Sequence, residues 1–267
     1  PKCVKINMKM YEELKKRVER ERAYHNQEKD VSKKAFNFKK LFRNYFSNPS
    51  LVEMENDLNK VKNISNKKVL DFGCGYGKDF DDLLLNDNEL TGIDISELYI
   101  RHCTNYCNKN FKDKKFSFFA MDAHDLKFED ETFDLIIGRG ILHHLDFNIA
   151  LKGIKRVLKK DGEAYFQEPL GDNPLLKIFR IITPNLRTKD ERPFYKKDLI
   201  KLERDFNIEF KYYGMISFIA SIITSPFTGN GNNFFVKLLY SIEKKLLKHN
   251  YFKYFGHYVI FKVKKNQ

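Results

Sequence analysis

Residues 69–77 read Val69-Leu70-Asp71-Phe72-Gly73-Cys74-Gly75-Tyr76-Gly77, a short apolar run that passes directly into a glycine-rich turn. The run predicts a strand, and the next residues, 78–85, predict a helix. Glycines between a strand and a helix let the backbone turn tightly and approach a ligand beside the helix N-terminus. The carboxylate of Asp71 would repel a pyrophosphate there, and it would attract a ligand that carries an ammonium group.

Strands and helices alternate after this turn. Apolar runs predict further strands at 90–94, 116–121, 133–137, 163–167, 208–213 and 258–263. Apolar periodicity and caps predict helices at 96–110, 147–158 and 195–206, and Asp161-Gly162 is expected to close the second of them. Such alternation implies crossover connections and a mainly parallel sheet. We therefore predict an α/β fold with a doubly wound sheet of seven strands, six parallel and one antiparallel.

The chain is expected to have two parts. Residues 1–66 are polar and rich in helix formers, and they predict a helical N-terminal cover or lid. Residues 67–267 predict the sheet domain, with its core at 67–168. Two excursions, 169–193 and 214–256, would leave from carboxyl ends of strands and cover the edge where open α/β sheets bind ligands.

The composition limits the setting and the partners of the chain. The 49 Lys and Arg residues against 36 Asp and Glu residues give a net charge of +13, which suits a polyanionic partner or reflects compositional drift over a solvated surface. No apolar run reaches the roughly 18 residues that a membrane span needs. The charged start lacks a signal-peptide core, and four cysteines do not make a disulfide framework. The expected location is cytoplasmic, and peripheral attachment to a membrane is compatible with it.

Five segments between Lys67 and Glu168 together resemble the class I S-adenosylmethionine-dependent methyltransferases, and residues 168–174 with 187–193 resemble the segments after the fifth strand in small-molecule methyltransferases. The five segments follow the order of the family's motifs: the acidic glycine-rich turn 71–77, the ribose-binding acid Asp94, the adenine-contacting turn 121–123, the fourth strand with its following segment 133–145, and the glycine-led fifth strand 161–166. The resemblance implies a Rossmann-like sheet, S-adenosylmethionine as the cofactor and methyl transfer as the activity.

The resemblance also implies a cofactor site. The methionine part would lie over the glycine turn, the ribose on Asp94 and the adenine near Asp122. The expected set is Asp71, Gly73, Cys74, Gly75, Gly77, Asp94, Ile95, Asp122, Ala123 and Arg139. Asp94 and Asp122 could instead serve only as caps of turns or helices.

Three residues are candidates for deprotonating or holding the methyl acceptor. His143 and His144 follow the fourth strand, and the pKa of an imidazole lies near the working pH. Glu168 ends the fifth strand. Alternatively, either histidine packs structurally and Glu168 is a turn carboxylate.

Substrate contacts are expected from Tyr24 and His25 in the cover and from Arg187 in the first excursion, where a carboxylate or phosphate could bind. Ordinary exposed or structural roles are the alternatives. We expect no metal, because Cys103 and Cys107 share a helical face but no second pair of ligands matches them.

The sequence also narrows the acceptor. The segment after the fourth strand lacks the Asn/Asp-Pro-Pro-Tyr/Phe sequence with which base amino-group methyltransferases hold a flipped base. Residues 215–227 are apolar and 234–248 predict a basic amphipathic helix, which could roof an apolar pocket, rest on an anionic membrane or pack as a cap or dimer contact. We expect methyl transfer to an O or N atom of a small apolar or amphipathic acceptor such as a lipid, quinone or specialised metabolite. The alternatives are an RNA or protein methyltransferase and a non-catalytic cofactor-binding protein.

Overall fold

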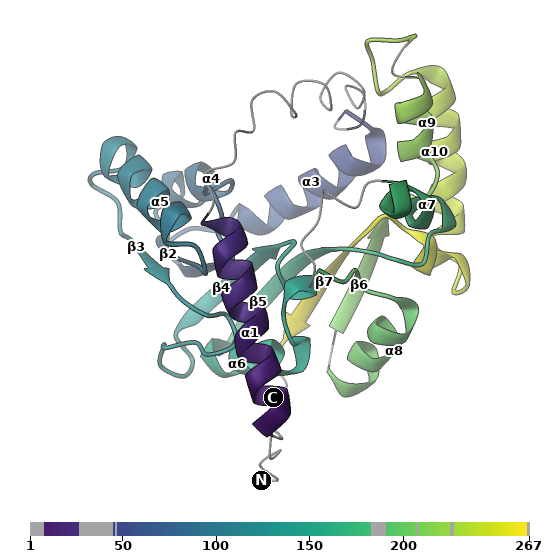
Figure 1. Cartoon of the computed structure of the whole chain (residues 1–267). Helices are drawn as coiled ribbons and strands as arrows, with labels where there is room; N and C mark the ends of the chain where they lie inside the picture. Colours follow the sequence, from purple (N-terminus) through teal and green to yellow (C-terminus); the bar gives the residue numbers. More distant parts are fainter. Residues whose placement is uncertain are drawn as a thin grey trace.

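A single seven-stranded sheet organises the computed structural model, which describes residues 8–26, 45, 47–182, 191–206, 208–224 and 227–265. Its strands run in the spatial order β3-β2-β1-β4-β5-β7-β6 (Figure 1). Their bounds are β1 (Lys68–Phe72), β2 (Glu89–Asp94), β3 (Phe116–Ala120), β4 (Phe133–Arg139), β5 (Leu158–Pro169), β6 (Ile208–Tyr213) and β7 (Tyr258–Lys264). Only β7 runs antiparallel to its neighbours, β5 and β6, among the described strands. The predicted fold class is therefore confirmed.

Helices cover both faces of the sheet (Figure 1). Alternating side chains of β1 divide the core: Val69 packs with α4 (Phe80–Leu85) and α5 (Glu97–Asn110), whereas Leu70 packs with α6 (Phe147–Val157) and α8 (Lys196–Asp205). Five further described elements follow β4 in the chain: η1 (Leu142–His144), α7 (Pro174–Ile182), α9 (Ser217–Thr224), α10 (Phe234–Leu246) and η3 (Phe252–Phe255). Cys103 and Cys107 lie fully buried in the α4/α5 core. No described helix is long and apolar enough to cross a membrane.

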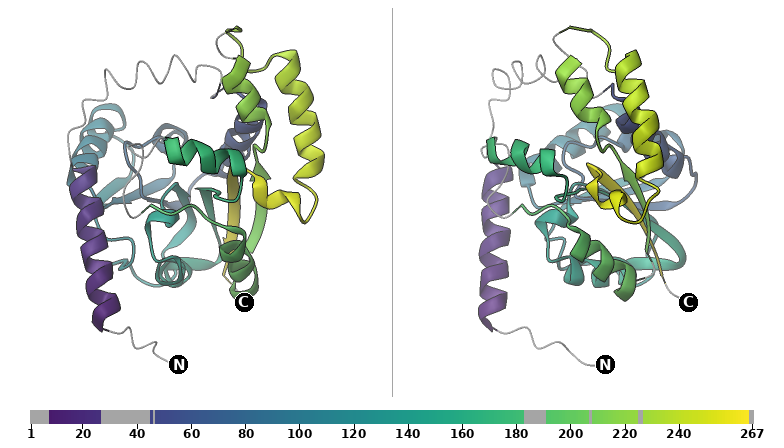
Figure 2. Two further views of the ribbon diagram at one scale, coloured as in Figure 1. Left: turned by 45° about the vertical axis from the view of Figure 1, so that its right-hand side comes forward. Right: turned by 90° about the vertical axis from the view of Figure 1, so that its right-hand side faces the viewer.

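Two helices of the described residues precede the sheet. The α3 helix (Pro49–Lys62) packs Leu51, Met54 and Leu58 against Tyr213 of β6 and Ile260 of β7. The α1 helix (Met8–His25) instead stands along one side of the molecule, apart from α3 (Figure 2). The α3 helix therefore shares a core with the sheet, although it lies before residue 66. The predicted division of the chain at residue 66 stays a prediction.

The start of β5 differs from the prediction. The α6 helix ends at Val157, and β5 begins at Leu158, so that Asp161-Gly162 lies inside the strand and does not close the helix. Leu158 is buried and pairs with Phe133 across a register shift in β4. A Cβ on Gly162 would lie only 2.9 Å from Cδ1 of Leu158 and 3.0 Å from the carbonyl oxygen of Asp134. Gly162 has no Cβ and therefore allows β4 and β5 to approach this closely.

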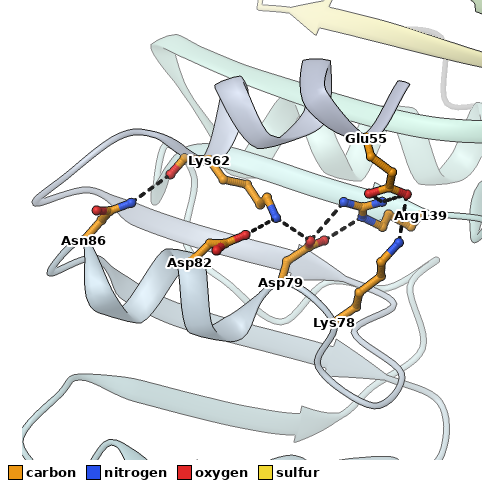
Figure 3. A network of polar contacts seen from close by, with 7 residues as sticks. All are labelled: Glu55, Lys62, Lys78, Asp79, Asp82, Asn86 and Arg139. Atoms are coloured by element: carbon orange, nitrogen blue, oxygen red, sulfur yellow. Dashed lines mark hydrogen bonds and ion pairs between the residues drawn. The ribbon is translucent and has the colours of Figure 1, made fainter. Parts of the chain in front are cut away.

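A buried polar network joins α3, the glycine-rich turn and the end of β4 (Figure 3). The Arg139 guanidinium donates to both carboxylate oxygens of Asp79, at 2.7 and 3.0 Å, and to both oxygens of Glu55, at 3.0 Å each. Lys62, itself buried, donates to Asp79 at 2.9 Å and also contacts Asp82. Lys78 donates to Glu55 at 2.8 Å. Burial alone would raise the pKa of Asp79, but Arg139 and Lys62 outweigh burial and lower it.

We expect Arg139→Met to reduce the free energy of unfolding by about 3 kcal/mol, because it leaves the buried Asp79 with only part of its compensating charge. Urea unfolding at neutral pH measures this. The matched control is Arg101→Met, which removes a guanidinium from an exposed pair with Glu97 and should cost about 0.5 kcal/mol or less.

The same variant should show a defined pH dependence. A carboxyl whose pKa is lowered in the folded state stabilises the protein above its unfolded pKa, and this contribution disappears as pH falls through the folded pKa. The stability difference between wild type and Arg139→Met should therefore shrink in the acid range below the usual pKa of an aspartate. An equal difference at all pH values would exclude Asp79 as the group that loses its partner.

Candidate functional site

The glycine-rich turn has the backbone conformation that its glycines allow. Gly73 and Gly77 have φ angles of 79° and 80°, in the left-handed region that strains other residues. A Cβ on Gly73 would lie 2.8 Å from Cγ1 of Ile141, so the turn and the segment after β4 pack closely. The amide groups of Gly73 and Cys74 both donate to the carbonyl oxygen of Ile93, at 2.9 Å each. The turn is thereby fixed to the end of β2.

Asp94 stands at the end of β2 with its carboxylate beside the turn. Its Oδ2 accepts from the Gly75 amide at 3.0 Å, and its Oδ1 accepts from the Ser96 amide at 2.9 Å. Burial raises the pKa of Asp94, although these two backbone donors act in the opposite direction. Each oxygen retains a lone pair, so the carboxylate can still accept from two neighbouring hydroxyl groups of a ligand.

A cavity opens at this edge of the sheet, under α1. Its lining consists of Arg17, Val18, Glu21, His25, Gly73, Gly75, Ile93, Asp94, Ile95, Tyr99, Met121, Asp122, Ala123, His124, Arg139, Gly140, Ile141, His144 and Leu145. Seven of the ten residues expected to bind the cofactor belong to this lining; Asp71, Cys74 and Gly77 do not. The side chain of Cys74 lies in the α4/α5 core, and Gly77 shapes the turn.

Asp71 is buried behind the turn. Burial, together with the nearby carboxylate of Asp79, raises the pKa of Asp71 well above its usual range, although Arg139 acts against this. A ligand ammonium group near the turn would lower the cost of ionising this carboxyl.

Arg139 lines the cavity, but its guanidinium already binds Asp79 and Glu55. Arg139 therefore also compensates the charges of two carboxylates, a role that the sequence did not indicate. Its expected contact with the cofactor stays a prediction.

The turn after β3 holds Asp122 in place. The backbone amide of His124 donates to Asp122 Oδ1 at 2.9 Å, and Nδ1 of the His124 ring lies 2.7 Å from the same oxygen. Nε2 of His124 accepts from the Asp146 amide at 2.9 Å, which leaves Nδ1–H as the donor to Asp122. His124 was not expected in the site, although its spacing of two residues from Asp122 permits this local bond.

Glu168 lies outside the cavity and is completely buried. Its Oε1 accepts from the amides of Ile141 at 3.0 Å and Leu142 at 2.8 Å, and its Oε2 lies 2.7 Å from Nδ1 of His143. The His143 amide completes the set at 3.3 Å from Oε2. Glu168 therefore holds the η1 turn and orients His143. A direct role toward the acceptor has no support from this placement.

The two histidines have different surroundings. His143 is buried against Glu168, whereas His144 faces the cavity. Nδ1 of His144 lies 3.3 Å from Oε2 of Glu21, and Nε2 of His25 lies 3.5 Å from the same oxygen. Glu21 thus lies between two imidazoles, with its own side chain almost wholly buried. The sequence carried one signal for it: Glu21 and His25 are four residues apart on one helix and so share a face.

The α1 helix is docked over the cavity by polar contacts. The Ser96 hydroxyl donates to the carbonyl oxygen of His25 at 3.3 Å and to Oδ1 of Asn26 at 2.8 Å. Arg17 donates to the carbonyl oxygen of His143 at 3.4 Å. His25 therefore reaches the cavity as expected, Tyr24 lies next to it outside the lining, and Arg187 falls outside the described residues.

His143, His144 and Glu191 offer ligand atoms within 4.8 Å of one another. Oε1 of Glu191 lies 3.9 Å from Nε2 of His143 and also 3.9 Å from Nη1 of Arg180. The positive charge of Arg180 therefore partly compensates the Glu191 carboxylate without a metal ion. The absence of a metal stays a prediction, and a chelator tests it below.

The cavity fits S-adenosylmethionine by the chemistry of its wall. The Asp94 carboxylate suits two ribose hydroxyls, and the buried Asp71 behind the turn suits a nearby ammonium group. Ile95, Met121 and Leu145 supply apolar surface for a purine ring.

Comparison with known proteins identifies the domain. A family model described as "Methyltransferase domain" matches residues 70–166. An uncharacterised protein of Methanocaldococcus jannaschii, MJ0638, is 30% identical over 158 residues, which are 58% of this chain and 65% of that protein. The O-methyltransferase cnsE of Penicillium expansum is 29% identical over 46% of this chain and 48% of that protein. The sterol 24-C-methyltransferase erg6 of Aspergillus fumigatus is 32% identical over 36% of this chain and 26% of that protein. The chain thus matches less than two thirds of the length of each of these relatives.

Solved structures share the fold at low sequence identity. The YcgJ protein of Bacillus subtilis has a TM-score of 0.53 and 17% identity, over 79% of this chain and 98% of that chain. The geranyl diphosphate C-methyltransferase of Streptomyces coelicolor has a TM-score of 0.58 and 10% identity, over 81% of both chains. With the family match, the sheet order and the acidic glycine-rich turn in agreement, the domain that contains residues 70–166 is a class I S-adenosylmethionine-dependent methyltransferase domain, and S-adenosylmethionine is its cofactor.

Proposed function

We propose that this chain transfers a methyl group from S-adenosylmethionine to an O or N atom of a small apolar or amphipathic acceptor such as a lipid, quinone or specialised metabolite. The observation that carries the proposal is the pairing of His144 with Glu21 in the wall of the cavity that contains Asp94 and the glycine turn. A hydroxyl or ammonium acceptor must lose a proton, and this pair supplies a proton acceptor beside the cofactor site.

The cofactor, when bound, supplies a methyl group on a sulfonium for in-line displacement. The chain's own residues then have three tasks. The turn 73–75 and Asp94 bind and orient the cofactor, and α1 with its buried Glu21 excludes water from the cavity. His144 accepts the proton of the acceptor at a ring nitrogen, and the Glu21 carboxylate stabilises the resulting imidazolium.

The lining favours a small acceptor over a macromolecule. The apolar residues Val18, Ile141 and Leu145 line the same cavity as His144, and α1 contributes to its wall. The relatives named above include an O-methyltransferase and a sterol methyltransferase, which is consistent with a small acceptor of low polarity. RNA or protein acceptors and a non-catalytic role are the alternatives, and labelled methyl transfer into lipid extract, RNA and protein fractions distinguishes them. Label in RNA or protein alone, or in none of the fractions, would contradict the proposal.

Asp94→Asn should weaken binding of S-adenosylmethionine by about 10- to 100-fold, because the amide cannot accept at both positions as the carboxylate does. Calorimetric titration with S-adenosylmethionine and S-adenosylhomocysteine measures the affinity. Asp113→Asn, at an exposed carboxylate outside the cavity lining, is the matched control and should bind as wild type does. Equal affinity in the two variants would remove Asp94 from the cofactor site.

His144→Ala should lower the turnover number by about 100-fold or more, because it removes the proton acceptor. Glu21→Gln should lower it by about 10- to 100-fold, because the charge that stabilises the imidazolium is lost. Affinity for S-adenosylmethionine should change little in both variants. Turnover is followed as labelled methyl in the acceptor that the fractionation provides.

Two controls accompany these variants. Glu13→Gln changes an exposed carboxylate on the same helix and should leave turnover unchanged. Addition of a chelator tests whether a metal at His143, His144 and Glu191 contributes, and the proposed mechanism expects no effect. Wild-type turnover in both His144→Ala and Glu21→Gln would exclude this pair from proton transfer.

A further inference from the structure

The α9–α10 hairpin presents large apolar side chains to solvent. Phe227 is 85% exposed, Phe234 is 83% exposed and Ile223 is 61% exposed, all around the connection between the two helices. Phe235, Leu238 and Ile242 continue this exposed set along α10. These six residues form the hairpin surface. In Figure 1 the hairpin projects from the top right of the molecule, away from α5 and β3.

Hydrogen bonds fix α9 and α10 to each other and to α3, so the exposed side chains lie on a well-defined part of the fold. Buried Glu243 of α10 accepts from the amides of Met215, Ile216 and Ser217 at 2.8 to 3.0 Å, which joins it to the start of α9. The Asn48 side chain donates to the Ser221 hydroxyl at 2.8 Å and so ties α9 to the start of α3. Asn233 caps α10 by accepting from the Val236 amide at 3.1 Å and donates to the Thr224 hydroxyl at 3.0 Å.

The exposed charges of α10 and of the residues just after it are all positive. Lys237, Lys244, Lys245 and Lys248 are exposed on or just after α10, whereas its single acidic residue, Glu243, is buried. Lys244 lies 3.8 Å from Glu53; Lys237, Lys245 and Lys248 have no carboxylate partner in the described part of the chain. A second copy of the chain packed symmetrically on this surface would face these lysines with their equivalents. An anionic lipid surface instead accepts both the lysines and the apolar side chains.

We infer that the hairpin surface docks on the headgroup and acyl boundary of anionic membranes, with Phe227 and Phe234 inserted and the α10 lysines on the phosphates. This inference concerns membrane attachment and does not depend on the acceptor proposed above. It specifies which residues enter the lipid and therefore which direction the molecule faces.

The absence of tryptophan from the chain permits a direct test. In the full chain, Phe234→Trp introduces a single reporter at the hairpin surface, and Leu85→Trp introduces one at a 66% exposed position on α4. Vesicles of phosphatidylcholine with phosphatidylglycerol should shift Phe234→Trp emission to the blue, and brominated acyl chains should quench it. Leu85→Trp should show neither effect. Vesicles of phosphatidylcholine alone should bind much more weakly.

The lysines are tested in the Phe234→Trp background. Lys237→Gln, Lys245→Gln and Lys248→Gln combined should weaken vesicle binding by about 100-fold or more, since each lysine near an anionic surface contributes about 1 kcal/mol. The matched set Lys109→Gln, Lys112→Gln and Lys115→Gln, exposed at the other end of the sheet, should have little effect. Absence of a blue shift, equal quenching of Leu85→Trp, equal effects of both lysine sets, or a shift caused only by RNA or by self-association would each overturn the inference.

Discussion

The site depends on one buried carboxylate, that of Glu168. It accepts hydrogen bonds from the amides of Ile141 and Leu142 and from the His143 ring, and a buried donor without such an acceptor would be costly. The same bonds fix Ile141, whose side chain occupies the space that a Cβ on Gly73 would need. Glu168 therefore sets the position of His143 and His144 relative to the glycine-rich turn, although Glu168 does not line the cavity.

A second constraint acts from the opposite direction, through α1. Most of this helix is polar, and its contacts with the sheet domain are mainly hydrogen bonds and ion pairs with Ser96, the η1 turn and His144. Contacts of this kind are weaker in water than a packed apolar core. The α1 helix, which completes the cavity, is therefore held less firmly than the sheet edge beneath it. A cover over a binding site must move to admit a ligand, and weak polar contacts permit this movement.

The sequence predicted the parts of the molecule that local pattern determines. Short apolar runs located all seven strands, and the glycine spacing located the turn, because both depend on neighbours in the chain. The partners of Arg139 were not predictable, since Glu55 and Asp79 approach it only through the packing of α3 and the turn on β4. The contact of Glu21 with His144 likewise joins distant segments. The start of β5 was misplaced because Asp161-Gly162 is typical of a helix end, whereas pairing of Leu158 with Phe133 begins the strand earlier.

The two excursions share a consequence of strand direction. Because β5 and β6 both run parallel to β1, α7 and α9 begin at the same edge of the sheet as the glycine turn and η1. Asn173 joins them by donating to the carbonyl oxygens of Met215 at 2.9 Å and Phe255 at 2.7 Å. From α7, Arg180 reaches Glu191, which lies beside His143. The α9–α10 hairpin and the histidine pair are therefore both built on segments that leave the carboxyl ends of the strands.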